Sequence, residues 1–294
     1  MTGAERPVEP GTLYVVATPI GHLRDITLRA LDVLAAVDLI AAEDTRITQG
    51  LLAAYGLRKP MQALHEHNEA QLSPRLIEAL RQGHSIALVC DAGTPAVSDP
   101  GARLIRAVRA AGLAVTPVPG ASAATAALSV SGLAAEHWLF YGFLPSKAKA
   151  RREALQSLSA LPYALVFYEA PHRIAASVAD MAELLGGQRS LVLARELTKR
   201  FEQVVHLTLS EAEAWLAADP DRRRGEFVLV VSGASGPPAP AVDAQRVLAI
   251  LRDELPPAQA ARLAARLTGC RRQDLYALAL APADEQSRDA DDQP

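Results

Sequence analysis

The sequence is poor in aromatic residues and in cysteine, and it lacks any long apolar run. Only 4% of its 294 residues are aromatic, whereas alanine and leucine are abundant, which suits helices packed on sheets. The two cysteines, Cys90 and Cys270, have no spacing that indicates a metal site or a disulfide framework. A membrane-spanning helix needs about 20 consecutive apolar residues, and no stretch of the sequence has them. The first ten residues contain no apolar run. We therefore expect a protein of the reducing cytoplasm.

Several binding motifs are also absent. In phosphate loops a lysine completes the charge neutralisation, and dinucleotide folds carry GxGxxG after the first strand. This sequence has neither feature, which argues against a polyphosphate cradle and against NAD or FAD. His65 and His67 have no further ligand at metal spacing, so we predict no metal. A formal charge of −3 argues against a chain that coats nucleic acid over its whole surface.

The chain does contain a regular alternation of short apolar runs and helical periodicity. The runs begin with LYVVA and DLIAA, and the helices are predicted at 27–37, 46–55, 69–81, 101–111 and 122–131. Such βα repetition predicts an α/β fold with an open, mostly parallel sheet in a domain spanning 12–136. Thr27 is predicted to cap the first of these helices, and Asp99 with Pro100 the fourth.

The rest of the chain is denser in strands and ends in helices. Strands predicted at WLFYGF, ALVFYE, SLVLARE, EQVVHL and EFVLVV favour a mixed sheet in a second α/β domain, 137–233. Residues 234–241 have the composition of a linker, and 242–282 predict a small domain of three helices spaced like a helix-turn-helix. Residues 1–11 and 283–294 are predicted to be disordered.

Four polar or Gly-rich loops fall at the carboxyl ends of the first domain's predicted strands, where open α/β sheets bind ligands. These loops are TPIGHLRDIT, EDTR, DAGTPAVSDPG and PGASA. In one of them, DAGTPAVSDPG, Pro95 and Pro100 stiffen the loop while Gly93 and Gly101 permit close backbone approach. This loop predicts a preformed, largely neutral concavity for a flat polar ligand that is not multiply anionic. Asp91 either accepts hydrogen bonds from such a ligand or caps its own turn.

These loops, together with GFLPSKAKARR, FYEAPHR, LARELTKRFE and RRGEFVLVV, resemble the tetrapyrrole-methylase-like (class III) S-adenosylmethionine methyltransferases. The resemblance covers Leu13 to about Ser232, and EDTR, FYEAPHR and ARELTK resemble the members that act on ribosomal RNA. It implies S-adenosylmethionine in a cleft between the two α/β domains. It also implies a homodimer that methylates a cytidine ribose 2′-hydroxyl in 16S rRNA of the small ribosomal subunit.

Two alternatives to this activity stay open. The first keeps the fold and cofactor but methylates a tetrapyrrole or corrin precursor. The second is a DNA-binding regulator that senses a nucleoside metabolite. The basic clusters and the C-terminal helices argue against the first alternative, and EDTR and RELTK have no role in the second.

The resemblance also implies a set of cofactor contacts, many of them made by the backbone. They are Pro19, Ile20, Asp91, Gly93, Thr94, Val97, Ser122, Ala123, Glu169 and Ala170.

A ribose hydroxyl is a poor nucleophile unless its proton is removed or its alkoxide is stabilised. The candidate catalytic residues are Glu43, Asp44 and Arg46 after the second strand, and Glu196 and Lys199 in RELTK. The alternative is that these residues form local ion pairs of little energetic value.

RNA binding requires a local basic surface in this acidic chain. The candidates for RNA contacts are Lys147, Lys149, Arg151, Arg152, Arg173, Arg271 and Arg272, and Arg222, Arg223 and Arg224 form a further cluster. Such clusters favour a phosphate track, although basic runs are also common on solvated faces.

Overall fold

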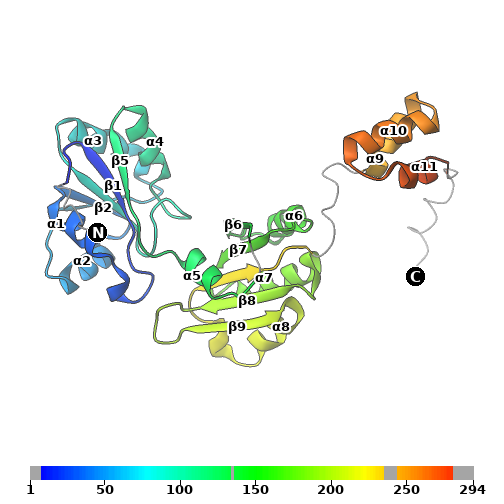
Figure 1. The fold of residues 1–294 in the computed structure, drawn as a ribbon. Coiled ribbons are helices and arrows are strands. Elements are labelled where there is room, and N and C mark those ends of the chain that lie inside the picture. The colour runs from blue at the N-terminus through cyan, green and yellow to red at the C-terminus, as the bar shows by residue number, and fades with distance from the viewer. Residues whose placement is uncertain (1–7, 134–135, 235–243, 281–294) are drawn as a thin grey trace. The chain divides into compact units, whose positions relative to one another are not determined.

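A computed structural model describes residues 8–133, 136–234 and 244–280. The chain divides into two compact units (Figure 1): a large unit that ends at Gly233 and contains two sheets, and a small C-terminal unit of helices. Of the predicted disordered N-terminus 1–11, linker 234–241 and tail 283–294, residues 1–7, 235–241 and 283–294 lie outside the described residues.

The first sheet is parallel and has the strand order β3-β2-β4-β1-β5. Its strands are β1 (Thr12–Val16), β2 (Leu39–Ala42), β3 (Met61–Ala63), β4 (Ile86–Val89) and β5 (Ala114–Val118). The central strands are apolar on both faces because helices cover both faces. Ala30, Leu34 and Leu52 pack on one face and Leu76 and Leu104 on the other.

Helices α1 (Leu28–Ala36) and α2 (Thr45–Ala54) therefore cover one face of this sheet, and α3 (Glu69–Arg81) and α4 (Ala102–Ala110) cover the other. Strands β1 and β4 lie side by side, but the chain leaves β1 towards a helix on one face of the sheet and leaves β4 towards a helix on the other face. A ligand site in such a sheet is expected at the carboxyl ends of these two strands.

The two predicted helix caps have different outcomes. Thr27 caps α1 as predicted, since its hydroxyl accepts a hydrogen bond from the Ala30 N–H at 3.0 Å. The prediction that Asp99 and Pro100 cap α4 is wrong. Gly101 occupies the cap position with φ +124°, and the Leu104 N–H donates to the buried carboxylate of Glu69 on α3 at 2.8 Å.

The second sheet is mixed, as predicted, with the order β6-β7-β10-β8-β9. Its strands are β6 (Trp138–Phe143), β7 (Ala164–Glu169), β8 (Ser190–Arg195), β9 (Gln203–Thr208) and β10 (Phe227–Val231). Only the β6–β7 pair is parallel; the other pairs are antiparallel.

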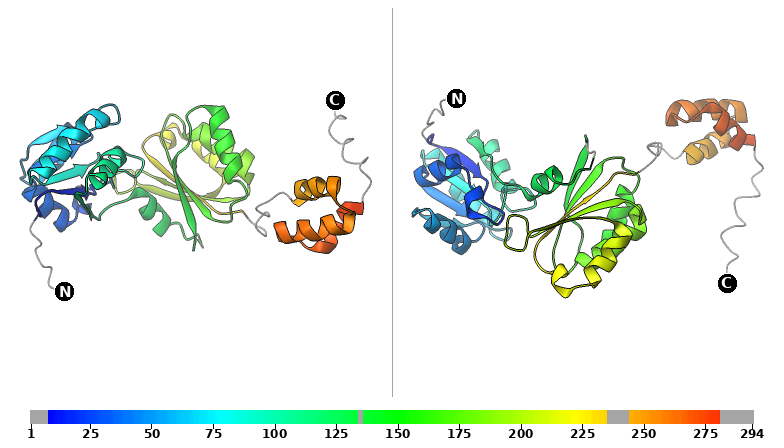
Figure 2. Two further views of the ribbon diagram at one scale, coloured as in Figure 1. Left: turned by 90° about the horizontal axis from the view of Figure 1, so that it is seen from above. Right: turned by 60° about the horizontal axis from the view of Figure 1, so that its bottom comes forward.

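Helix α5 (Ala123–Ser129) packs its alanines on one face of this second sheet, against Val166, Val192 and Val230. The remaining helices of the unit, α6 (Ala148–Leu158), α7 (Ile174–Met181) and α8 (Leu209–Ala217), pack together on the other face (Figure 2). A π-helical turn, η2 (Ala182–Gly186), extends α7, and the single turns η1 (Leu23–Asp25) and η3 (Pro220–Arg223) lie in loops. The predicted boundary between the two α/β domains, between residues 136 and 137, stays a proposal.

The small unit consists of α9 (Ala244–Glu254), α10 (Pro257–Thr268) and α11 (Arg272–Leu280). They enclose a core of Leu248, Leu275 and four alanines. The α/β fold with a small helical C-terminal part is thus confirmed. Among the helices of the described ranges, none is long and apolar enough to cross a membrane.

Removal of the Glu69 carboxylate should destabilise the large unit. Glu69→Ala leaves the Leu104 N–H at the start of α4 without its acceptor, and a buried unsatisfied amide costs about 1–3 kcal/mol. We expect a lower urea midpoint for unfolding of the large unit. The exposed Glu66→Ala serves as the control and should change the free energy of unfolding by less than about 0.5 kcal/mol. Equal shifts for both variants would contradict the capping role.

Candidate active site

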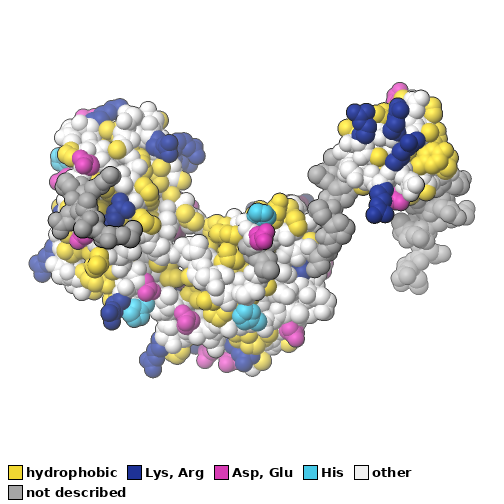
Figure 3. Space-filling model, viewed as in Figure 1, with side chains coloured by type: hydrophobic (Ala, Val, Ile, Leu, Met, Phe, Trp, Pro, Cys, Tyr) yellow, Lys and Arg dark blue, Asp and Glu magenta, His cyan; other side chains and the backbone are white. Residues whose placement is uncertain are grey.

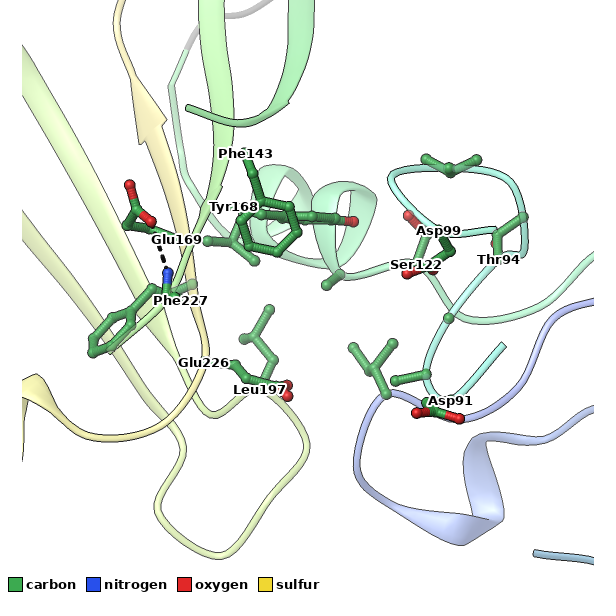
Figure 4. Close-up of a pocket in the computed structure, with 18 of the residues that line it drawn as sticks. Asp91, Thr94, Asp99, Ser122, Phe143, Tyr168, Glu169, Leu197, Glu226 and Phe227 are labelled. Atoms are coloured by element: carbon green, nitrogen blue, oxygen red, sulfur yellow. Dashed lines mark hydrogen bonds between the residues drawn. The ribbon is translucent and has the colours of Figure 1, made fainter. Parts of the chain in front are cut away.

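A cavity of about 410 Å³ lies within the large unit, between the loops that follow the first sheet and the edge of the second sheet. Figure 4 shows Asp91, Thr94 and Asp99 on one side and Tyr168, Leu197 and Glu226 on the other. The volume falls within the roughly 300–1,000 Å³ typical of small-molecule sites. Its lining contains neither Lys nor Arg among the described residues.

The 91–101 loop forms one wall, and backbone contacts hold it in place. The Thr18 N–H donates to the Gly93 carbonyl at 2.8 Å, and the Gly93 N–H returns a bond at 3.1 Å. The Thr94 hydroxyl donates to the Ala121 carbonyl at 3.1 Å. Ala96 and Ser98 have φ of 65° and 66°, which non-glycine residues seldom adopt. The loop is therefore a fixed, strained structure rather than a generic turn.

Gly142 on β6 allows this loop to reach the second sheet. A Cβ placed on Gly142 would lie 2.7 Å from the Ser98 hydroxyl oxygen, and the residue has φ +80°. The β6–β7 register also shifts between Phe140 and Gly142. The missing side chain of Gly142 therefore lets the 91–101 loop approach β6.

The RELTK loop forms the opposite wall and contacts the loop after β1. The His22 N–H donates to the Thr198 hydroxyl at 3.0 Å, and a Cβ on Gly21 would lie 2.6 Å from Lys199 Cγ. Glu196 and Thr198 have φ of 51° and 63°. Like the first wall, this loop is strained and joined to its neighbour.

Lys199 donates to two carboxylates, Glu196 at 3.0 Å and Glu226 at 2.9 Å. Burial works to lower the pKa of Lys199, but the two hydrogen bonds outweigh it and raise that pKa. The ammonium is therefore fixed and charged. It has three donor hydrogens, so these two bonds leave one donor for a ligand.

Among the acidic residues that line the cavity are three from the loops of the first sheet, Glu43, Asp91 and Asp99. Burial is the main cause that raises the pKa of each. Glu43 accepts a hydrogen bond from the Asp91 N–H at 3.3 Å, and Asp91 accepts one from the Asp44 N–H at 3.0 Å. A cation would relieve the cost of burying these charges, whereas a polyphosphate would increase it.

S-Adenosylmethionine fits this environment. It carries a sulfonium and an ammonium but no phosphate, so a cavity with buried carboxylates and no basic lining suits it. Gly93 lines the cavity with φ +87° and without a side chain, which allows a ligand to approach the backbone. Asp91 and the loop around Gly93 would hold it.

The aromatic side of the cavity was not predicted from the sequence. Tyr168 accepts a hydrogen bond from the Ala124 N–H at 3.2 Å, and half-exposed Phe143 packs edge-on to it with ring centroids 5.6 Å apart. Asp99 was also missed, because it was assigned to a helix cap. The available indication was that an aromatic residue stands at or next to the carboxyl end of both predicted strands, Phe143 at the end of WLFYGF and Tyr168 before the last residue of ALVFYE.

The structure brings nine of the ten predicted cofactor residues together in the cavity lining. These are Ile20, Asp91, Gly93, Thr94, Val97, Ser122, Ala123, Glu169 and Ala170; Pro19 is buried next to Ile20. The Glu169 side chain is fully buried and accepts hydrogen bonds from the Ser177 hydroxyl and the Ala170 N–H. Its carboxylate thus has structural partners of its own, and cofactor contact by these residues stays a proposal.

The predicted catalytic residues separate into two groups. Glu43 lines the cavity, and Lys199 is hydrogen bonded to a residue that lines it. Asp44 caps α2 and forms an exposed pair with Arg46, with Arg46 Nε 3.0 Å from Asp44 Oδ1. The hydrogen bonds from Arg46 lower the pKa of Asp44 to about 2.

Several predicted RNA contacts have internal partners. Arg151 and Arg152 pair with Asp180, and Arg152 also pairs with Glu183. Arg173 lies 2.9 Å from the Glu169 carboxylate and donates to the Leu144 carbonyl. Lys147, Lys149, Arg271 and Arg272 are exposed.

The further basic cluster behaves in the same way. Arg222 lies over the Trp215 ring at 4.6 Å, Arg223 donates to the Leu216 carbonyl, and Arg224 pairs with Asp221. A basic run in the sequence therefore does not by itself give a free basic surface.

The fold and the cavity together identify the class. Residues 12–213 match the Tetrapyrrole (Corrin/Porphyrin) Methylases, and residues 238–283 match the RsmI C-terminal HTH domain. A solved uroporphyrin-III-C-methyltransferase from Thermus thermophilus has a TM-score of 0.55 at 23% identity, covering 76% of this chain and 94% of that one. The methyltransferase CobJ has a TM-score of 0.59 at 19% identity, with 76% and 95% coverage. The chain belongs to the tetrapyrrole methylases.

Within that class, the chain belongs with proteins named Ribosomal RNA small subunit methyltransferase I. The protein of that name from Xylella fastidiosa Temecula1 is 52% identical over 268 residues, 91% of this chain and 98% of the relative. The one from Escherichia coli O157:H7 is 50% identical over 272 residues, 92% of this chain and 95% of the relative. The predicted family and its S-adenosylmethionine cofactor are thereby confirmed. Another solved neighbour, with a TM-score of 0.54, is complexed with S-adenyl homocysteine.

Gly142→Ala should distort the cavity. The new Cβ would lie 2.7 Å from the Ser98 hydroxyl oxygen, so this side chain must leave its position in the 91–101 loop, and we expect about tenfold weaker S-adenosylmethionine binding by calorimetry, or about 1.4 kcal/mol. Gly186→Ala is the matched control, because Gly186 has φ +101° but open space around its Cβ position. The control should keep wild-type affinity, and an equal loss in both variants would exclude the loop contact as the cause.

Affinity for S-adenosylmethionine should fall as the pH is lowered through the raised pKa values of the cavity carboxyl groups. The raised pKa values of Glu43, Asp91 and Asp99 place their protonation above the usual carboxyl range near 4, and protonation removes their attraction for a cation. Asp91→Asn should reduce the slope of affinity against pH, measured by calorimetry, whereas exposed Asp25→Asn should not. A pH-independent affinity in the wild type would refute this assignment.

Proposed function

We propose that the protein transfers the methyl group of S-adenosylmethionine to the 2′-hydroxyl of a cytidine ribose in 16S rRNA of the small ribosomal subunit. The observation that carries the proposal is how much of this chain its close relatives match. They match over 91–92% of this chain, whereas the solved tetrapyrrole enzymes cover only 74–76% of it. The RNA-acting proteins thus share nearly the whole chain, including the matched C-terminal helical segment.

The same comparison weakens the tetrapyrrole alternative. The solved tetrapyrrole enzymes are almost fully covered, at 94–96% of their own length, without a counterpart for about a quarter of this chain. An enzyme that needed only the two-sheet unit would have no use for a further helical unit. The proposal retains the predicted homodimer and cytoplasmic location, which the family resemblance supports.

S-Adenosylmethionine supplies an electrophilic methyl group on a positively charged sulfur when it is bound. The strained loops around Gly93 and Thr198 would align the donor with the incoming hydroxyl, and alignment alone supplies much of the acceleration of such a displacement. The apolar part of the lining, including Phe143, Leu197 and Val228, would limit the access of water.

Glu43 is the best placed of the predicted groups to take the ribose proton. It lines the cavity, and burial raises its pKa, which makes it a stronger base than an ordinary carboxylate. Asp44 is a poorer base, because its pKa is lowered to about 2 and its oxygens already accept from Arg46. Lys199 would stabilise the developing alkoxide through its remaining donor.

The activity is tested with labelled S-adenosylmethionine and small subunits from cells that lack this modification. We expect label in 2′-O-methylcytidine after digestion to nucleosides. Glu43→Gln should lower kcat by about 10²–10⁴-fold, the usual contribution of a general base, while Asp44→Asn should lower it less than about tenfold. Calorimetry on both variants checks that S-adenosylmethionine still binds.

Failure of the wild type to label a cytidine ribose, with the cofactor bound, would refute the proposed substrate. Turnover of a corrin precursor would instead favour the tetrapyrrole alternative. If substrate is methylated but Glu43→Gln retains full kcat, only the assignment of the base is wrong.

A further inference from the structure

Helix α4 carries three arginines that the sequence analysis did not consider. Arg103, Arg106 and Arg109 are all exposed, whereas Leu104 and Val108 on the same helix are fully buried against the first sheet. Their i, i+3, i+6 spacing places them along one slanted stripe with about 4.5 Å of rise per step. Figure 3 shows Lys and Arg side chains gathered over α4. We call these three residues the α4 arginine row.

The row is free of the internal pairing that engages Arg151 and Arg152. Within the described residues, none of the three guanidinium groups has a carboxylate within ion-pair distance or a hydrogen bond to another side chain. Arg151 and Arg152, by contrast, are held by Asp180 and Glu183. Three unpaired charges on one stripe are unusual in a chain of net charge −3.

The α4 arginine row also begins next to the candidate active site. Val97 and Asp99 line the cavity, and Arg103 follows Asp99 by four residues. The amino end of α4 is not itself open to an anion, because the Glu69 carboxylate already accepts from Leu104. Attraction for an anion at this place therefore comes from the guanidinium groups.

We propose that the α4 arginine row binds the phosphate backbone of the RNA that presents the target nucleotide to the cavity. The inference rests on the proposed function and names the surface through which the substrate is held. The row rises about 9 Å along the helix, a span on the order of three nucleotide steps of a duplex strand. Arginine suits phosphate because its planar fork donates two hydrogen bonds to one group.

The test measures binding of small subunits, and of protein-free 16S rRNA, by the full-length protein as a function of salt. Arg106→Gln with Arg109→Gln removes two charges and leaves Arg103, the residue nearest the cavity. Loss of two phosphate contacts should lower the slope of log affinity against log salt by about 1.4–1.8, and weaken binding about tenfold at 50 mM salt. Arg106→Lys with Arg109→Lys should retain most of the slope.

Arg29→Gln with Arg58→Gln is the matched control. Both arginines are exposed and without an ion pair, and Arg29 lies on α1, which covers the opposite face of the first sheet. The control removes the same charge and should leave the salt slope unchanged. Cofactor affinity, measured by calorimetry, should be the same in all of these variants.

Equal slopes for the α4 variant and the wild type, or equal losses in the α4 variant and the control, would overturn the proposal. An effect on intact subunits but not on protein-free rRNA would assign the row to a ribosomal protein and also overturn it. Failure of the proposed function gives a different result from failure of this proposal, because in that case the wild-type protein methylates no RNA.

Discussion

Close contact around Gly93 and Gly142 is the constraint on which the candidate active site depends. The paired hydrogen bonds between Thr18 and Gly93 tie the loops after β1 and β4 together, and the missing side chain of Gly142 lets Ser98 reach β6. Ala96 and Ser98 keep left-handed backbone conformations that cost about 1–3 kcal/mol each. The structure tolerates this strain because the loop is held at both ends. A cavity with walls from two sheets is the result.

The cavity's charge follows from the same enclosure. Burial raises the pKa values of Glu43, Asp91 and Asp99, so the folded protein holds protons more tightly than the unfolded chain in the window between the ordinary and the raised pKa. Stability therefore decreases as the pH rises through that window. A bound cation offsets the same cost. Ligand preference and stability are thus linked through one set of carboxylates.

The sequence predicted the elements well because their patterns are local. Helix α3 was predicted with its observed ends, and β6 and β7 likewise, since periodicity and flanking turns are contained within a few residues. The Asp99 cap failed because the actual acceptor, Glu69, lies 35 residues away in the chain. The aromatic wall at Phe143 and Tyr168 was missed for a similar reason. Only the pairing of β6 with β7 brings those rings together.

A run of basic residues in the sequence does not show which of the side chains form ion pairs in the fold. Adjacent arginines such as Arg151 and Arg152 are rotated by about 100° from each other on a helix, so at least one of them tends to face other protein elements. Here both find carboxylates on the segment that contains α7 and η2, and they serve packing. Arginines three residues apart share a face instead, and the buried leucine and valine between them keep that face outward. On α4 the helical spacing of the arginines, without a basic run in the sequence, places three charges that are unpaired among the described residues on the exposed side of the helix.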